Sequence, residues 1–436
     1  MSNRVEIGQQ LPDIRESEAW HTKARRLIPA QCQTLAKGPT QYVDGVAPKY
    51  LVHGRGCRVW DVDGNEFIDL TMGVGPLVLG YGNEAVDRAV TDQLKQGVVF
   101  SLVHPLEVEV AEQLNRLVPG AECVRYSKTG ADVTSAAVRL ARAFTGRERV
   151  LCSGYHGWHD WYIGSTSRGR GVPQSQRLEV QAFQHGNIQQ LEALLDEQVA
   201  CVILEPVLFD APNPDFLRQA KRAVEEAGAL LIFDEMWTGF RVALGGAQER
   251  YDVKADLATF SKAVANGLPL SVLTGRRDVM QLLEEEVFFF TTFGGEALSL
   301  AAAKATLAEL ERLSVPQVLE ERGAWLAEEY NRLATQKGLE FTSAVGLPCR
   351  TMISFRADQV DPLLAKSFLG QELLRHGVLW SGFHNLSYAH TAAELEHVVK
   401  AYDRALDELG KAIAENRLRE SILGRPVQPV FRKVNA

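Results

Sequence analysis

The chain has 436 residues, 46% hydrophobic and 23% charged, a composition typical of soluble globular proteins and unlike that of disordered or fibrous ones. Lysine and arginine total 47 against 55 aspartate and glutamate residues, and this net charge of −8 argues against nucleic-acid or anionic-membrane partners. The six cysteines are widely spaced, and we find neither a signal-peptide pattern nor an apolar run of roughly 20 residues. We therefore expect a cytoplasmic protein that binds neither nucleic acid nor membrane.

The first 70 residues are predicted to form a helical lead-in followed by a hairpin. Two short β runs within 57–69 flank Asp63-Gly64, a dipeptide favoured in tight turns. We assign residues 1–70 to an N-terminal segment that packs with a smaller domain.

Residues 71–313 alternate between apolar runs and helical patterns. Strands are expected at 150–152, 200–204, 229–233 and 270–273, because nearly all of their residues are apolar, as in strands covered on both faces. Helices are expected over 132–144 and 214–227, the second opened by Asn213-Pro214. This alternation predicts a large α/β domain with a parallel sheet.

After residue 313 the pattern changes to helix, strand, helix, strand, helix. The last of these is a long amphipathic run over 392–416. We expect residues 314–436 to form a smaller α+β domain.

Lys262 is the only ionisable residue between 257 and 275. Desolvation lowers the pKa of a lysine and leaves a nucleophilic amine, which suits imine chemistry with a carbonyl compound. The alternative is a lysine whose stem crosses apolar surface while its ammonium reaches water.

Two carboxylates follow apolar strands. Asp234 ends the run at 230–233, and Glu205 follows the run at 202–204. Open α/β sheets bind ligands at the carboxyl ends of their strands, where an acid keeps a heteroaromatic nitrogen protonated. Either residue is also explained by a helix cap or a surface salt bridge.

Two further segments suit a flat, phosphorylated cofactor. Thr129-Gly130-Ala131 opens the helix predicted at 132–144, where backbone N–H groups favour phosphate, although Thr129 with Asp132 also resembles an ordinary capping box. The run 155–161 is rich in aromatic residues that either stack on a cofactor or fill a core.

Two other cofactor types are disfavoured. The histidine pair at 156 and 159 lacks further ligands, so we expect no metal site. The glycine-rich run at 73–80 is not a dinucleotide fingerprint, because Pro76 occupies the turn.

Taken together, these segments resemble the class III pyridoxal-phosphate (PLP) aminotransferases, particularly the branch similar to glutamate-1-semialdehyde aminomutase. The most specific pieces are 231–241, 256–269, 137–147 and Tyr155-His156-Gly157. The resemblance implies a PLP-dependent transferase of fold type I, with a mainly parallel sheet in the large domain. It also implies the cofactor contacts, namely Lys262 in a Schiff base, Asp234 at the pyridine nitrogen, Met236 and Tyr155 on opposite ring faces, and Glu205 nearby.

The phosphate-binding segments depart from the family pattern. The usual Ser-Gly-Thr-Glu is Thr129-Gly130-Ala131-Asp132 here, which keeps the backbone N–H groups and loses one hydroxyl that Lys128 or Thr129 replaces. Thr292 keeps the hydroxyl that in relatives reaches the phosphate of the neighbouring subunit. The resemblance therefore implies a homodimer with shared active sites.

The resemblance implies an enzyme that moves an amino group from an amino donor to a carbonyl acceptor, such as a sugar or a semialdehyde. The alternatives are a 2,1-aminomutase, for which the segment 164–173 is short, and a decarboxylase or racemase. A catalytically silent binding protein would lose Lys262 or Asp234, and both are present. Arg168 and Arg170 belong either to a substrate-binding loop or to a solvated one.

Overall fold

The computed structural model describes residues 10–209 and 214–429 and divides into two compact units. Unit 1 comprises Met1–Asn83 and Val318–Ala436, and unit 2 comprises Glu84–Gln317. The unit boundaries therefore fall after residues 83 and 317, whereas the sequence pattern places them after 70 and 313. No helix among the described residues is long and apolar enough to cross a membrane.

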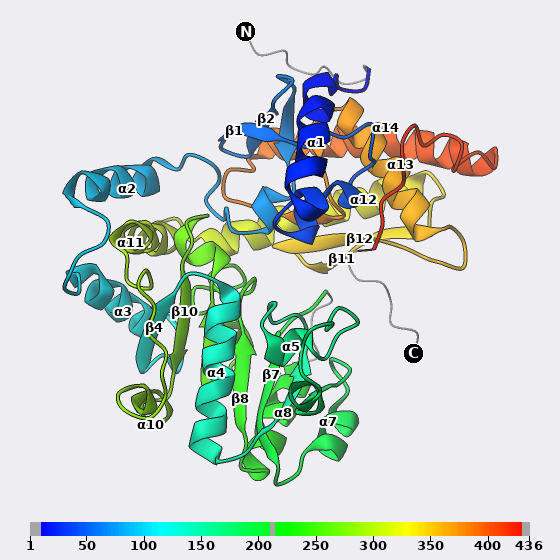
Figure 1. The fold of residues 1–436 in the computed structure, drawn as a ribbon. Coiled ribbons are helices and arrows are strands. Elements are labelled where there is room, and N and C mark those ends of the chain that lie inside the picture. Colours follow the sequence, from blue (N-terminus) through cyan, green and yellow to red (C-terminus); the bar gives the residue numbers. More distant parts are fainter. Residues whose placement is uncertain (1–9, 210–213, 430–436) are drawn as a thin grey trace. The chain divides into compact units, whose positions relative to one another are not determined.

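Unit 2 is built around a sheet that has seven strands in the described part of the chain, in the order β4-β10-β9-β8-β7-β5-β6. The strands are β4 (Cys123–Ser127), β5 (Arg149–Ser153), β6 (Val180–Ala182), β7 (Val199–Leu204), β8 (Leu230–Asp234), β9 (Leu257–Phe260) and β10 (Ser271–Gly275). The α-helices of this unit are α2 (Glu84–Gln96), α3 (Pro105–Leu117), α4 (Gly130–Thr145), α5 (Asp160–Ile163), α6 (Gln174–Leu178), α7 (Ile188–Leu194), α8 (Pro214–Glu226), α9 (Gly246–Tyr251), α10 (Arg277–Met280) and α11 (Ala297–Arg312), as drawn in Figure 1.

The sheet is mainly parallel, with one reversed strand. Strand β10 runs antiparallel to both of its neighbours, β4 and β9, so the expectation of a parallel strand at 270–273 is wrong in direction. The sequence of an apolar strand does not indicate whether the strand runs parallel or antiparallel to its neighbours, because burial on both faces requires only apolar side chains. The other strands run one way, and their carboxyl ends lie along the same edge of the sheet.

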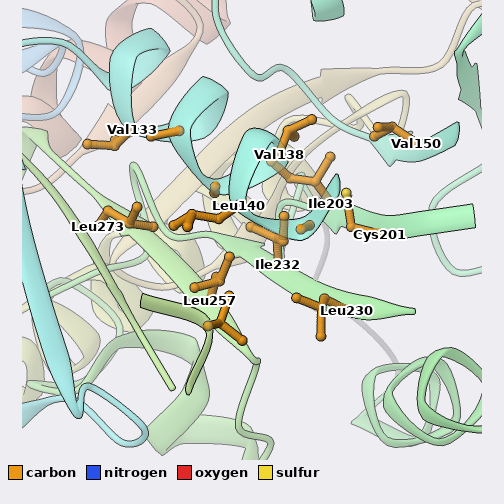
Figure 2. Packing of buried hydrophobic residues seen from close by; sticks show 14 of the residues in the cluster. Val133, Val138, Leu140, Val150, Cys201, Ile203, Leu230, Ile232, Leu257 and Leu273 are labelled. Carbon is orange, nitrogen blue, oxygen red and sulfur yellow. The ribbon is translucent and has the colours of Figure 1, made fainter. Parts of the chain in front are cut away.

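The core of unit 2 lies between helix α4 and the sheet. Figure 2 shows Val133, Val138 and Leu140 of this helix directed toward apolar residues of the strands. Helix α4 is capped before its first residue by the side chain of Thr129 and after its last residue by Gly146, which adopts a left-handed conformation with φ of 68°. The strands at 150–152, 200–204 and 229–233 and both predicted helices are confirmed, while Asn213 lies outside the described residues.

Unit 1 contains two small sheets. One has the order β1-β2-β3-β13 and includes the predicted hairpin, and the other has the order β11-β12-β14. The strands are β1 (Leu51–Arg55), β2 (Arg58–Asp61), β3 (Glu66–Asp69), β11 (Thr342–Leu347), β12 (Arg350–Phe355), β13 (Val378–Leu379) and β14 (Phe383–Asn385). The helices are α1 (Arg15–Leu27), α12 (Val315–Gln336), α13 (Pro362–Arg375) and α14 (Ala392–Ala414), and the first three residues of α12 precede the boundary of the unit.

Candidate active site

Asp234 is buried at the carboxyl end of β8, where both of its carboxylate oxygens accept hydrogen bonds. One oxygen lies 2.8 Å from Nδ1 of His156, and the other accepts from the backbone N–H of Met236 at 3.1 Å. Because a carboxylate only accepts hydrogen bonds, Nδ1 of His156 is the donor. Each oxygen of Asp234 keeps further lone pairs, so the group is able to accept another N–H.

His156 is the residue that sequence reasoning missed. Its ring is buried and held in place through the backbone, because the Thr134 hydroxyl of α4 donates to its carbonyl at 2.9 Å. Its Nε2 is buried and has no hydrogen-bond partner within the described residues. The imidazole ring of His156 is therefore oriented so that its Nδ1–H points at the carboxylate of Asp234.

Glu205 lies at the end of the neighbouring strand β7 and faces the same cluster. Its carboxylate accepts from the backbone N–H of Tyr155 at 2.7 Å, and a Cβ on Gly154 would lie 2.8 Å from the same oxygen. Burial raises the pKa of Glu205, and the charge of Asp234 raises it further, while the Tyr155 N–H, His156 and Lys262 oppose both effects. Glu205 therefore lies within the electrostatic reach of Asp234 and Lys262.

Lys262 follows β9 and begins a short 3-10 helix, Lys262–Ala265. Strands β8 and β9 are parallel, with Asp234 opposite Thr259, so the turn that carries Lys262 leaves the sheet at the same edge as Asp234. Its backbone has a left-handed φ of 46°, which costs a non-glycine residue free energy. Lys262 is half-buried, so its amine is only partly secluded.

The start of helix α4 forms a compact polar turn. Asp132 accepts from the Ser127 hydroxyl and the Thr129 N–H, each at 2.8 Å, and the Thr129 hydroxyl caps the N–H of Asp132 at 3.4 Å. Partial burial opposes ionisation of Asp132, but these hydrogen bonds outweigh it and lower its pKa. The capping-box interpretation is therefore confirmed, and it leaves the first backbone N–H groups of the helix for a ligand.

Glycines let two segments approach this helix start closely. A Cβ on Gly130 would lie 2.8 Å from Sδ of Met236, and a Cβ on Gly157 would lie 2.7 Å from Cβ of Ala131. Gly157 also has a φ of 104°, which side chains rarely adopt. Met236 and the 155–157 segment are thus both brought to the helix start.

Tyr155 and Thr292 are, like Thr129, exposed members of the predicted set. Tyr155 is 50% exposed and meets the ring of Tyr162 edge-on, with centroids 5.6 Å apart. Burial raises the pKa of Tyr155, and the charge of Asp234 adds to the effect. Thr292 lies on an exposed turn before α11 and, within residues 10–209 and 214–429, forms no hydrogen bond or ion pair with the Asp234 cluster.

Lys128 is already engaged by its own chain. Its ammonium lies 2.8 Å from the carboxylate of Glu296 and 3.2 Å from the carbonyl of Pro269. Glu296 caps α11 through the N–H groups of Leu298 and Ser299. Within the described residues, no group of three or more histidine, cysteine, aspartate or glutamate side chains is arranged to hold a metal ion.

Comparison with known proteins matches residues 43–413 to the class-III aminotransferase family. The chain is 32% identical over 406 residues to a 3-aminobutyryl-CoA aminotransferase of Cloacimonas acidaminovorans, covering 90% of this chain and 96% of the relative. It is 34% identical over 357 residues to a glutamate-1-semialdehyde 2,1-aminomutase of Methanothrix thermoacetophila, covering 78% and 82%.

Among solved structures, the PLP internal aldimine form of the FumI protein of Sphingopyxis sp. superposes with a TM-score of 0.85. That pair is 28% identical and covers 91% of this chain and 97% of the other. An omega-transaminase of Sphaerobacter thermophilus superposes with a TM-score of 0.82 at 24% identity, over 91% of this chain and 98% of the other. The chain therefore belongs to the class III aminotransferase family, and it is a PLP-dependent enzyme of fold type I that moves an amino group from a donor to a carbonyl compound.

Proposed function

We propose that the carboxyl edge of the unit 2 sheet is the PLP site and that Asp234 contacts the pyridine nitrogen. When bound, PLP acts as an electron sink for the substrate carbon, provided that its ring nitrogen stays protonated. Asp234 suits that role, because it is buried, held by two donors and still able to accept an N–H. His156 is a positioning residue that acts through Asp234.

The phosphate is assigned to the start of α4. The backbone N–H groups of Gly130 and Ala131 and the positive end of the helix supply its contacts, because the Thr129 hydroxyl already caps the helix. Lys128 is bound to Glu296, so it is not needed as the replacement ligand. Met236 and Tyr155 are assigned to the two faces of the ring, because Met236 lies against Gly130 and the backbone N–H of Tyr155 donates to Glu205 at the end of β7.

Lys262 is assigned both covalent attachment and proton transfer. Its amine, once free, would take the proton from the substrate carbon that bears the amino group and pass it to the cofactor, and it would carry a proton in the opposite direction in the second half of the reaction. The observation that carries this proposal is the position of Glu205, Asp234 and Lys262, which lie at or just after the carboxyl ends of the neighbouring parallel strands β7, β8 and β9. The charges of Asp234 and Lys262 both act on the pKa of Glu205. Glu205 occupies the same edge and completes the polar lining.

Intermolecular transamination, with a sugar or a semialdehyde as the acceptor, is the favoured reaction. The segment 164–173 is short for an aminomutase, and Arg177 fastens it by donating to the carbonyls of Gly169 and Val172. Arg168 and Arg170 are both exposed on this segment and are able to bind an anionic group of the substrate. The aminomutase remains the second candidate, because a 34% identical relative bears that name.

A homodimer with shared sites is supported by one exposed apolar face of unit 2. The N–H of Ala297 bonds to the carbonyl of Val98 at 2.9 Å and ties two apolar segments together. Exposed side chains on these segments are Val99, Phe100, Leu102, Val103, Val108, Phe288, Phe290 and Phe293. Monomeric proteins rarely expose apolar patches of this kind, so we assign the face to a second copy that receives Thr292.

We also infer a cytoplasmic location. All six cysteines are free thiols, which is typical of proteins in reducing compartments. Cell fractionation with an antibody against the chain tests this inference, and recovery of the chain from an oxidising compartment would contradict it.

The reaction is tested by adding candidate amino donors to the purified enzyme and recording the cofactor absorbance. A transaminase converts fully to the aminated cofactor, releases the keto product, and is restored by a separate carbonyl acceptor. An aminomutase instead converts glutamate-1-semialdehyde without any second substrate. Absence of a spectral change with every amine tested would contradict both assignments.

A further inference from the structure

The segment 288–296 leads into α11 and carries Thr292. Within the described residues it contains turns but no helix or strand, so its conformation depends on contacts that other elements supply. Its three phenylalanines that are more than half exposed belong to the apolar face assigned to a second copy. The contacts that hold this segment therefore determine where Thr292 is presented.

Two arginines hold the first part of the segment. The Arg125 guanidinium donates to the carbonyl of Phe289 at 2.6 Å and lies 4.7 Å from the ring centroid of Phe290, within the range of a cation–π contact. Arg139 donates to the carbonyl of Phe288 at 2.8 Å. Arg125 belongs to β4 and Arg139 to α4, so the start of the segment is fixed against the sheet and its covering helix.

Two glycines let the turn that follows lie close to its neighbours. A Cβ on Gly294 would lie 2.8 Å from the carbonyl oxygen of Tyr126 in β4, and a Cβ on Gly295 would lie 2.6 Å from the carboxylate of Glu107 in α3. Neither approach leaves room for a side chain. The turn 291–295 therefore lies directly against β4 and α3.

The ion pair of Lys128 and Glu296 holds the end of the segment. Its charged atoms are 2.8 Å apart and its side chains are only 21% and 11% exposed, so solvent screens it less than a surface pair. Burial raises the pKa of Glu296, but the hydrogen bonds from Lys128 and Ser299 outweigh burial and lower it. Glu296 is therefore a carboxylate at neutral pH, and Lys128 has a charged partner.

The same ion pair joins two helix starts. Lys128 directly precedes Thr129, which caps α4. Glu296 caps α11 by accepting from two of its N–H groups at 2.8 and 3.0 Å. The pair therefore connects the start of α4, where the phosphate is assigned, to the turn that carries Thr292.

We propose that the Lys128–Glu296 ion pair positions Thr292 for the PLP phosphate of the neighbouring subunit. The proposal rests on the proposed function, which assigns that phosphate to the start of α4 and the apolar face to a dimer. In such a dimer the Thr292 of each chain serves the other chain's site. A broken pair therefore weakens PLP binding at the partner's site more than at its own, and Lys128 and Glu296 are positioning residues.

Mixed dimers separate the two sites. Lys262→Ala silences one chain, so that covalent attachment of PLP reports only on the Lys262 of the other chain. Glu296→Gln is placed either in the silent chain, which donates Thr292 to the site that is read out, or in the chain that carries Lys262. Glu296→Gln keeps an oxygen that accepts from the start of α11 and removes only the charge, so folding is preserved.

The two mixed dimers are isolated as apoenzymes by means of two affinity tags, titrated with PLP, reduced with borohydride and mapped at Lys262 by mass spectrometry. We expect about tenfold weaker PLP binding when Glu296→Gln is in the donating chain, because the charge-assisted contact that positions Thr292 is lost. Binding should stay within about twofold of the parent when Glu296→Gln is in the chain that carries Lys262.

Glu309→Gln in the donating chain is the matched control. Glu309 lies on the same helix, is 16% exposed and pairs with Arg312 at 2.7 Å, and its loss should leave PLP binding unchanged. Equal PLP affinity in the two mixed dimers, or the same loss with Glu309→Gln, would overturn the proposal. A parent that forms no dimer, or that carries the adduct elsewhere than Lys262, would overturn the proposed function itself.

A double-variant cycle checks that the two side chains act together. Lys128→Gln in the donating chain should weaken PLP binding at the partner's site about as much as Glu296→Gln, and combining the two should add no more than about twofold. Fully additive losses would show that Lys128 and Glu296 act separately and would also overturn the proposal.

Discussion

The strand-end cluster around Asp234 and the exposed face around Phe290 both carry residues assigned to the active site, yet their surroundings are opposite. Asp234 and His156 are buried and bonded to each other. On the segments 99–108 and 288–293, by contrast, apolar side chains face solvent, with Leu102 84% and Val103 81% exposed. The first region is completed by its own chain.

This difference in burial separates the parts of the site that one chain forms alone from those that need a second surface. Buried polar groups have to be paired within the fold, so the geometry of Asp234 is already set before any ligand binds. Exposed apolar groups gain stability only when another surface covers them. We therefore expect variants of the cluster to affect chemistry, and variants of the face to affect assembly first.

The largest effect is expected for Asp234→Ala. Loss of the carboxylate removes the partner of the ring nitrogen and should cost at least about 3 kcal/mol of transition-state stabilisation, a fall in kcat of about 100-fold or more. Asp234→Asn keeps the shape and should be impaired as well, because the negative charge is what the reaction needs. Steady-state kinetics measure this, and activity of either variant within tenfold of the parent would exclude the role.

His156→Leu should lower kcat by about tenfold to a hundredfold, because Asp234 then loses a buried hydrogen bond worth about 1–3 kcal/mol. His156→Asn retains an N–H donor and should recover part of the loss. A purely structural role predicts instead that both variants lose thermal stability while kcat per folded enzyme is unchanged. Measuring kcat and KM separately, with melting curves as the control for stability, distinguishes the positioning role from the purely structural role.

The exposed face is tested by Leu102→Asp combined with Val103→Asp. Two carboxylates placed there oppose burial, so sedimentation should move toward the monomer, and activity should fall by about tenfold or more as Thr292 leaves the neighbouring site. Leu178→Asp is the matched control, since Leu178 is 71% exposed on α6. A fully active variant that is shown to be monomeric would refute the shared site.

The smallest effect is expected for Arg168→Ala combined with Arg170→Ala. If these side chains bind an anionic substrate, KM should rise by about tenfold, equivalent to about 1.4 kcal/mol, with cofactor binding unchanged. Arg218→Ala with Arg222→Ala, on the exposed face of α8, is the control pair. An unchanged KM for every accepted substrate would assign the loop to solvent.

Sequence patterns predicted the residues whose roles depend on their own strand. Asp234 ends a wholly apolar run and Lys262 is isolated among apolar neighbours, so each is visible locally. The Asp234–His156 pair was not predicted, because the two residues are 78 positions apart. They meet because β5 and β8 both flank β7, and strand order cannot be read from a run of apolar residues.

Because strand order and direction cannot be read from apolar runs, the reversal of β10 was not predicted. The strands at 123–127 and 257–260 were not predicted either. Strand β4 includes Arg125 and Tyr126 and is only half-buried, so it lacks the apolar signal of its neighbours. Helix α4 was predicted closely, because its cap, its apolar face and its terminal glycine all agree. The assignment of the exposed face to a dimer contact rests on the family resemblance, because an exposed apolar segment alone does not indicate which surface covers it.

The site of covalent attachment tests the assignment of the PLP site most directly. The purified enzyme is reduced with borohydride, digested and mapped by mass spectrometry, with Lys262→Ala as the matched variant. We expect a pyridoxyl group on Lys262 of the parent, and a folded Lys262→Ala protein that carries none and does not transfer amine. A reduced adduct on any other lysine of the parent, or amine transfer by Lys262→Ala at the parental rate, would contradict it.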